Sequence, residues 1–179
     1  MARILMKGCL KVKLYPKLYL ENVMKITEEM LNKNGIKGLI LDIDNTLIDY
    51  DKKIPDGVLK WCNDLKEKNI KMCILSNTNK VEKVKKVADL LDLEYIYFAH
   101  KPNKKGFKKA QKLLNLKPEE IAVVGDQIFT DVLGGNKMNM FTILTKPLDK
   151  RDIWITVIKR PFEKLVIKCY LKRRDTNVY

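Results

Sequence analysis

The sequence contains one histidine, His100, among 179 residues. This scarcity excludes catalytic sites that need several histidines, such as those of metallophosphoesterases and histidine phosphatases. The four cysteines form no C-x-x-C pair, which argues against a zinc site or a disulfide framework. A cysteine nucleophile of the C-x5-R kind is also excluded, because the residues six positions after the cysteines are Tyr15, Lys68, Asn79 and Asp175.

Long apolar runs are absent as well. A membrane-spanning helix needs about 20 mostly apolar residues, and Lys7, Lys11 and Lys13 interrupt the only stretch that resembles a signal peptide. Neither secretion nor a transmembrane helix is indicated. With 46% hydrophobic residues, the chain is long enough to form one globular domain with a proper core. Unpaired cysteines are typical of a reducing compartment, so we expect a cytoplasmic protein.

The formal net charge of +14 is concentrated at the two ends. Residues 1–20 hold five basic and no acidic residues, and residues 146–179 hold ten basic and four acidic ones. Residues 21–145 are nearly balanced, with 21 basic and 18 acidic residues. We therefore expect a basic N-terminal arm (1–20), a core (21–145) and a basic C-terminal extension (146–179). Such ends favour a polyanionic partner, either an anionic membrane surface or nucleic acid.

Short apolar runs alternate with helical periods along the core. The runs 38–42, 71–75, 95–99, 121–125 and 141–144 predict strands that are buried on both faces. Apolar residues recur at helical spacing over 58–65, 81–91 and 107–114. This alternation predicts an α/β fold with a doubly wound, mainly parallel, Rossmann-like sheet.

Polar residues follow four of these strands: Asp42, Asp44 and Thr46; Ser76 and Asn77; His100 and Lys101; Asp126 and Asp131. Because ligands of such sheets bind beyond the carboxyl ends of the strands, these residues should meet at one edge. Asp42 and Asp44 are one residue apart, and two carboxylates so close repel each other unless a hard cation binds them. The set suits phosphoryl transfer.

The order Asp-x-Asp-x-Thr, Ser, Lys-Pro and Gly-Asp-x-x-x-x-Asp resembles the haloacid dehalogenase (HAD) superfamily of aspartate-nucleophile phosphatases over roughly residues 36–145. The resemblance implies that Asp42 attacks phosphorus and that Asp44 acts as the acid and base. It also implies a Mg²⁺ ion held by the side chains of Asp42 and Asp126 and the backbone carbonyl of Asp44, with Asp131 supporting its water shell.

Thr46, Ser76 and Lys101 are then expected to bind the phosphoryl oxygens, and Asn77 to add a donor. Lys104 and Lys105 are the alternatives to Lys101, which is favoured by its place before a proline directly after a strand. The spacing from Asp44 to Ser76 and from Ser76 to Lys101 leaves no room for a large cap domain. The site should therefore be open to a large or surface-bound phosphate, with loop 47–54 as a candidate small flap.

Residues 151–174 place Trp154, Ile158, Phe162, Leu165 and Cys169 on one helical stripe among basic residues. A helix of this kind either lies in an anionic membrane interface or packs on the sheet with a solvated basic face, and periodicity does not separate the two. Pro161 should kink or split it.

The chain resembles the YqeG family of subclass IIIA HAD phosphatases in its motifs Asp-x-Asp-Asn-Thr and Gly-Asp-Gln-x-Phe-Thr-Asp, in its short core and in its basic ends. This family is related to phosphatidylglycerophosphate phosphatases. The resemblance implies a Mg²⁺-dependent phosphatase acting on phosphatidylglycerophosphate, and we expect a cytoplasmic protein that associates with the inner face of the membrane. The alternatives are a nucleotide or nucleic-acid-end phosphatase and a ribosome- or RNA-associated binding protein that keeps the HAD core as a scaffold. The oligomeric state is not indicated.

Overall fold

A computed structural model describes residues 13–149 and 154–175, and the side chains of 154–160 and 173–175 lie outside this description. Within it, one parallel sheet of six strands has the order β1-β6-β5-β2-β3-β4. The strands are β1 (Leu18–Leu20), β2 (Gly38–Leu41), β3 (Lys71–Leu75), β4 (Glu94–Ile96), β5 (Ile121–Gly125) and β6 (Phe141–Thr145). The five predicted strands correspond to β2 to β6, although β4 ends at Ile96 and the predicted strand extended to residue 99. The prediction of a parallel α/β sheet is confirmed.

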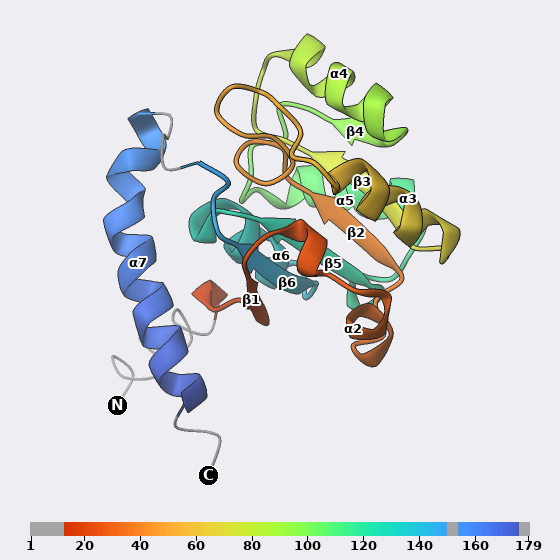
Figure 1. Cartoon of the computed structure of the whole chain (residues 1–179). Helices are drawn as coiled ribbons and strands as arrows, with labels where there is room; N and C mark the ends of the chain where they lie inside the picture. Colours follow the sequence, from red (N-terminus) through yellow and green to blue (C-terminus); the bar gives the residue numbers. More distant parts are fainter. Residues whose placement is uncertain (1–12, 150–153, 176–179) are drawn as a thin grey trace.

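Helices cover both faces of the sheet (Figure 1). They are η1 (Val23–Lys25), α2 (Glu28–Lys33), α3 (Val58–Glu67), α4 (Val81–Leu91), α5 (Lys104–Leu114), η2 (Pro118–Glu120), η3 (Ile128–Val132), α6 (Leu133–Lys137) and α7 (Trp154–Asp175). The three predicted helical periods correspond to α3, α4 and α5.

The central strand β2 shows why the sheet is covered on two sides. Leu39 and Leu41 belong to a buried cluster that includes Val84 of α4 and residues of α3. Ile40, which points to the opposite face, belongs to a second cluster with Phe107 of α5. All four residues of β2 are buried, which explains its continuous apolar run.

The chain reverses its direction across the sheet between β2 and β5, which are neighbours. From β2 it proceeds to β3 and β4 on one side, and it then crosses back to β5 and β6 on the other. The connections between β2 and β3 and between β3 and β4 contain α3 and α4, and no inserted domain is present in this part of the described chain. The carboxyl ends of β2 and β5 therefore open at the switch point, where such sheets bind ligands.

Strand β1 was not predicted. It pairs with β6 at the edge of the sheet, with Leu18 opposite Ile143, and it lies inside the segment expected to be a basic arm. The strand has three residues, which are too few to show a strand pattern in the sequence. Its pairing depends on β6, which is more than a hundred residues away. Residues 1–12 of the expected arm lie outside the described residues.

Helix α7 runs along the β1 edge of the sheet (Figure 1). Pro161 lies inside this one continuous helix, so the predicted splitting is not observed. Val166 and Ile167 pack against a buried cluster around Ile128, whereas Phe162 and Leu165 are 62% and 61% exposed.

The predicted stripe of α7 thus lies on the outer side of the helix as far as it is described. Its members Phe162, Leu165 and Cys169 are exposed, and Trp154 and Ile158 lie outside the described side chains. On the inner side, the hydroxyl of Tyr170 donates a hydrogen bond to the carbonyl of Lys17 at 3.4 Å. No helix of the described chain is both long and apolar enough to cross a bilayer.

Candidate active site

Lys101 joins two aspartates at the carboxyl edge of the sheet. Its Nζ lies 2.7 Å from Oδ1 of Asp42, which follows β2, and 2.7 Å from Oδ1 of Asp131 in η3. The Lys101 side chain is 3% exposed, and the two aspartate side chains are 8% and 2% exposed. Strands and helices that are far apart in sequence therefore bring three charges together away from water.

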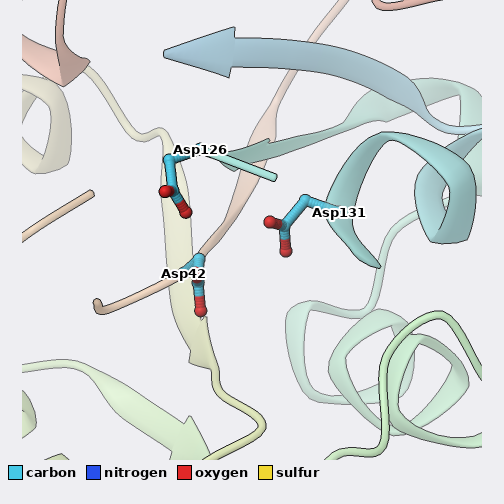
Figure 2. A group of neighbouring side chains, drawn as sticks. All are labelled: Asp42, Asp126 and Asp131. Atoms are coloured by element: carbon cyan, nitrogen blue, oxygen red, sulfur yellow. The ribbon is translucent and has the colours of Figure 1, made fainter. Parts of the chain in front are cut away.

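Asp126, directly after β5, completes an acidic cluster with Asp42 and Asp131. One carboxylate oxygen from each of the three residues lies within 4.8 Å of the others, and all three residues are buried. Figure 2 shows the carboxylates of Asp126 and Asp131 extending toward the end of the strand that carries Asp42. Oxygen donors without histidine or thiol suit a hard cation such as Mg²⁺, so the donor set fits the metal that the sequence predicts.

Gly125 and η3 explain how Asp131 reaches this cluster. A Cβ atom at Gly125 would lie 2.5 Å from Oδ2 of Asp131, so only glycine leaves room for that carboxylate beside β5. The backbone N–H of Gln127 and the hydroxyl of Thr130 donate to Oδ2 of Asp131 at 3.2 and 3.1 Å. Asp131 lies in η3, a π-helix, which is a form that is frequent at functional sites.

Burial and neighbouring charges shift the pKa values of Asp42 and Lys101. Burial raises the pKa of Asp42 to about 7, with Asp131 adding to the rise and Lys101 opposing it. Burial alone would lower the pKa of Lys101, but the carboxylates of Asp131 and Asp42 raise it above its ordinary value. Lys101 is therefore a cation, and a proton on Asp42 competes with any metal below about pH 7.

Asp44 lies outside the acidic cluster, on a tight turn. Asn45 has a left-handed backbone (φ 59°), which asparagine tolerates better than most residues. The N–H groups of Leu47 and Ile48 donate to the carbonyl of Ile43 at 2.8 and 3.1 Å and close the turn. The turn directs the Asp44 carboxylate, 32% exposed, onto the ammonium group of Lys83 in α4.

The four predicted phosphate-binding residues have different surroundings. Thr46 is buried, and its hydroxyl has no hydrogen-bond partner in the described chain. Ser76 is also buried, and its hydroxyl accepts from the N–H of Thr78 at 3.2 Å. The Asn77 amide is occupied by Lys101: its oxygen accepts from the Lys101 N–H at 2.6 Å and its nitrogen donates to the Lys101 carbonyl at 3.1 Å.

Asn77 therefore fixes the backbone that carries Lys101, and its amide nitrogen has a second N–H, so the predicted donation to phosphate stays a prediction. The alternatives Lys104 and Lys105 lie in the first turn of α5 and are exposed. Residues 49–53 of the candidate flap form a closed loop in which the Asp49 N–H donates to the Lys53 carbonyl at 3.0 Å.

Two residues near the site were missed by the sequence analysis. Lys83 is one lysine among several in α4, and nothing in its spacing marks it as a partner of Asp44. Glu163 of α7 is 2% exposed, and its carboxylate accepts hydrogen bonds from the N–H groups of Ile128 at 2.7 Å and Phe129 at 3.4 Å. Glu163 thus caps η3, which carries Asp131, and only the docking of α7 reveals this role.

The sheet, the switch point and the aspartate cluster define a HAD-like hydrolase. A profile of hydrolases described as "haloacid dehalogenase-like hydrolase" matches residues 51–139. The chain is 38% identical over 160 residues to "Probable phosphatase YqeG" of Bacillus subtilis, which covers 89% of this chain and 92% of that protein. The chain belongs to the YqeG family of HAD-like hydrolases and is a phosphatase.

Two further relatives share part of their length with this chain. A glyceraldehyde 3-phosphate phosphatase of Pyrococcus furiosus is 30% identical over 123 residues, which are 64% of this chain and 51% of that protein. Phosphatidylglycerophosphate phosphatase 1 of Arabidopsis thaliana is 23% identical over 175 residues, which are 88% of this chain and 48% of that protein. This chain therefore spans about half the length of either relative.

A solved structure supports the same fold. The p-nitrophenyl phosphatase of Archaeoglobus fulgidus superimposes with a TM-score of 0.51 at 16% identity, over 70% of this chain and 92% of that one. At this identity the likeness concerns the fold alone.

Proposed function

We propose that this protein is a Mg²⁺-dependent phosphomonoesterase that uses Asp42 as its nucleophile and removes the terminal phosphate of phosphatidylglycerophosphate at a membrane surface. The observation that carries the catalytic part is the buried cluster of Asp42, Asp126 and Asp131 with Lys101 between two of its members. A carboxylate nucleophile needs no general base to remove a proton, so Asp42 suits the role once it is ionised.

In the first step, an oxygen of Asp42 forms a bond to phosphorus as the bond to the leaving alcohol breaks. Asp44 donates a proton to the alcohol oxygen, and in the second step it takes a proton from the water that hydrolyses the aspartyl-phosphate. Water attack releases inorganic phosphate and restores Asp42. The side chains of Asp42 and Asp126 and the carbonyl of Asp44 would hold Mg²⁺, which offsets the repulsion between the carboxylate and the phosphate dianion.

The remaining polar groups bind or position the phosphoryl oxygens. Lys101 supplies a permanent positive charge, and the Thr46 hydroxyl, buried and without a partner in the described chain, is ready to donate to a phosphoryl oxygen. The Ser76 hydroxyl accepts one hydrogen bond and keeps its own proton for a ligand. Asp131, held by Gln127 and Thr130, keeps Lys101 in place and supports the metal's water shell.

The exposed side of α7 supports a lipid substrate. Phe162, Leu165 and Cys169 form an apolar strip on this helix, and Lys164, Lys168 and Lys172 are exposed beside it. A strip of this kind with adjacent lysines is typical of helices that lie in an anionic membrane interface. The similarity to a phosphatidylglycerophosphate phosphatase points to the same substrate.

A substrate panel tests the proposal. With Mg²⁺ present, the protein should release phosphate from phosphatidylglycerophosphate in anionic vesicles faster than from glyceraldehyde 3-phosphate, nucleotides or 5′-phosphorylated oligonucleotides. The double variant Phe162→Ser, Leu165→Ser should lower the ratio of lipid to soluble-substrate turnover by about tenfold, because each change removes an exposed apolar side chain that would insert into the membrane. Turnover of the soluble substrates by the same double variant is the control for general damage to α7.

Other outcomes would redirect the assignment. Faster turnover of phosphorylated polynucleotides, with binding to RNA or DNA and none to anionic vesicles, would favour a nucleic-acid-end phosphatase. Binding to RNA without any phosphatase activity would favour a binding protein on a HAD scaffold.

A further inference from the structure

Lys83 occupies a position that catalysis of phosphate release alone does not explain. It lies in the first turn of α4, where the positive end of the helix dipole disfavours a cation. Its side chain is nevertheless only 15% exposed, and it forms an ion pair with Oδ1 of Asp44. The fold thus holds a partly buried lysine side chain next to the residue proposed to protonate the leaving alcohol.

The ammonium group has donors to spare. A lysine carries three N–H donors, and within the described chain Lys83 uses one, in its contact with Asp44. Unused donors of a charged group are costly away from water, so an anion that fills them gains binding free energy. Lys101 has fewer donors left for a ligand, because two aspartates already engage it.

The location of Lys83 relative to the reaction is set by Asp44. In the proposed mechanism this carboxylate contacts the leaving oxygen, and its Oδ1 contacts Lys83. Two consecutive hydrogen bonds of about 2.8 Å through one carboxylate put the ammonium within roughly 8 Å of the leaving oxygen. Lys83 therefore faces the alcohol part of the substrate, while Lys101 faces the phosphoryl group.

We infer that Lys83 is a specificity-determining residue that binds a second anionic group, carried by the leaving alcohol a short spacer away from the phosphate ester. The inference rests on the proposed function, since Asp44 must serve the leaving group. It deepens that proposal by naming the residue that recognises the substrate class, a phosphomonoester whose alcohol bears a phosphodiester, as the glycerol head group of a phospholipid does. A neutral alcohol, such as that of glycerol 3-phosphate, leaves Lys83 without this contact.

Two water-soluble substrates test the inference without involving α7. One is the deacylated head group of phosphatidylglycerophosphate, whose leaving alcohol carries a phosphodiester, and the other is glycerol 3-phosphate. The unmodified protein should prefer the first by at least about tenfold in kcat/KM. Lys83→Met should lower this preference by about 10- to 100-fold, mainly through a higher KM for the diester, because it removes the charge that binds the diester.

Matched controls separate recognition from damage. Lys86→Met removes an exposed lysine from the same helix and should leave the preference unchanged. Lys83→Gln keeps a hydrogen-bond donor without the charge and should retain part of the preference. Inhibition of the unmodified protein gives a reading that needs no variant: glycerophosphoglycerol, the diester product, should inhibit at a concentration at least about tenfold lower than glycerol does.

The outcomes distinguish the two proposals. An equal loss on both substrates in Lys83→Met, or equal inhibition by the two alcohols, would overturn the role of Lys83 and leave the phosphatase assignment intact. Absence of turnover of either substrate by the unmodified protein with Mg²⁺ would contradict the proposed function, and this inference with it.

Discussion

Lys101 and Lys83 both contact an aspartate at the carboxyl edge of the sheet, but their surroundings differ. Lys101 is 3% exposed and lies between two buried carboxylates, and its backbone is clamped by Asn77. Among the described residues Lys83 has one partner, Asp44, whose side chain is 32% exposed. The comparison indicates a fixed cation that balances the charge of the site and an adaptable cation at its rim.

The largest effect on activity should follow from changing Asp42, one of the two aspartates that Lys101 contacts. Asp42→Asn should lower kcat by at least about 10⁴-fold, because it removes the proposed nucleophile and a metal ligand together. Asp44→Asn should cost less, about 10²- to 10⁴-fold, since it removes acid and base assistance only. Phosphate release assays on folded variants measure both, and near-normal activity of Asp42→Asn would refute the mechanism.

The two lysines should also differ in their effect on stability. Lys101→Met leaves Asp42 and Asp131 buried without their cation and should lower the free energy of unfolding by about 3–5 kcal/mol at pH 8. Lys83→Met breaks one partly exposed pair and should cost within about 1 kcal/mol. Urea denaturation of the metal-free proteins measures the difference. Equal losses would mean that Lys83 is as structural as Lys101.

The pKa of Asp42 predicts how pH affects metal binding. Because this pKa is raised from 3.8 to about 7, the folded metal-free protein holds a proton on Asp42 between these two pH values, whereas the unfolded chain has already lost it there. The contribution of this group to stability therefore falls as pH rises from about 4 to about 7. Mg²⁺ replaces the proton, so the rise in Tm caused by Mg²⁺ should be larger at pH 8 than at pH 6. A rise independent of pH would place the metal away from Asp42.

A smaller effect is expected at Glu163, which supports η3 from α7. Glu163→Gln keeps an acceptor for the N–H groups of Ile128 and Phe129 but removes the charge, and it should cost about 1 kcal/mol of stability. The Mg²⁺ concentration for half-maximal activity should rise a fewfold, because η3 carries Asp131. The exposed neighbour Lys164→Gln is the control and should change neither quantity.

The parts of the site that sequence predicted are those attached to buried strands. Asp42 and Asp126 directly follow β2 and β5, and the convergence of parallel strands at one edge is enough to bring them together. Lys101 was preferred to Lys104 and Lys105 from its place after a strand, and it is the lysine that contacts Asp42.

The parts that sequence missed depend on how elements pack. Lys83 is chosen from the lysines of α4 by the rotation of that helix against the turn at Asp44. The rotation of α7 is governed by Glu163, Val166 and Tyr170 on its inner side, whereas its more conspicuous apolar residues are left outside. Glu163 is buried and its carboxylate accepts from two backbone N–H groups, so it helps to decide which side of α7 faces inward. The periodicity of the apolar residues gives no sign of this contact.

The cap on η3 has a consequence for how the protein is made. Glu163 lies 35 positions after Ile128, whose N–H it accepts, so the ribosome completes β5, η3 and β6 before it adds this carboxylate. Domains generally fold as units. The domain therefore cannot fix η3, and with it Asp131, until α7 has been made, and this is the same helix that carries the exposed apolar strip.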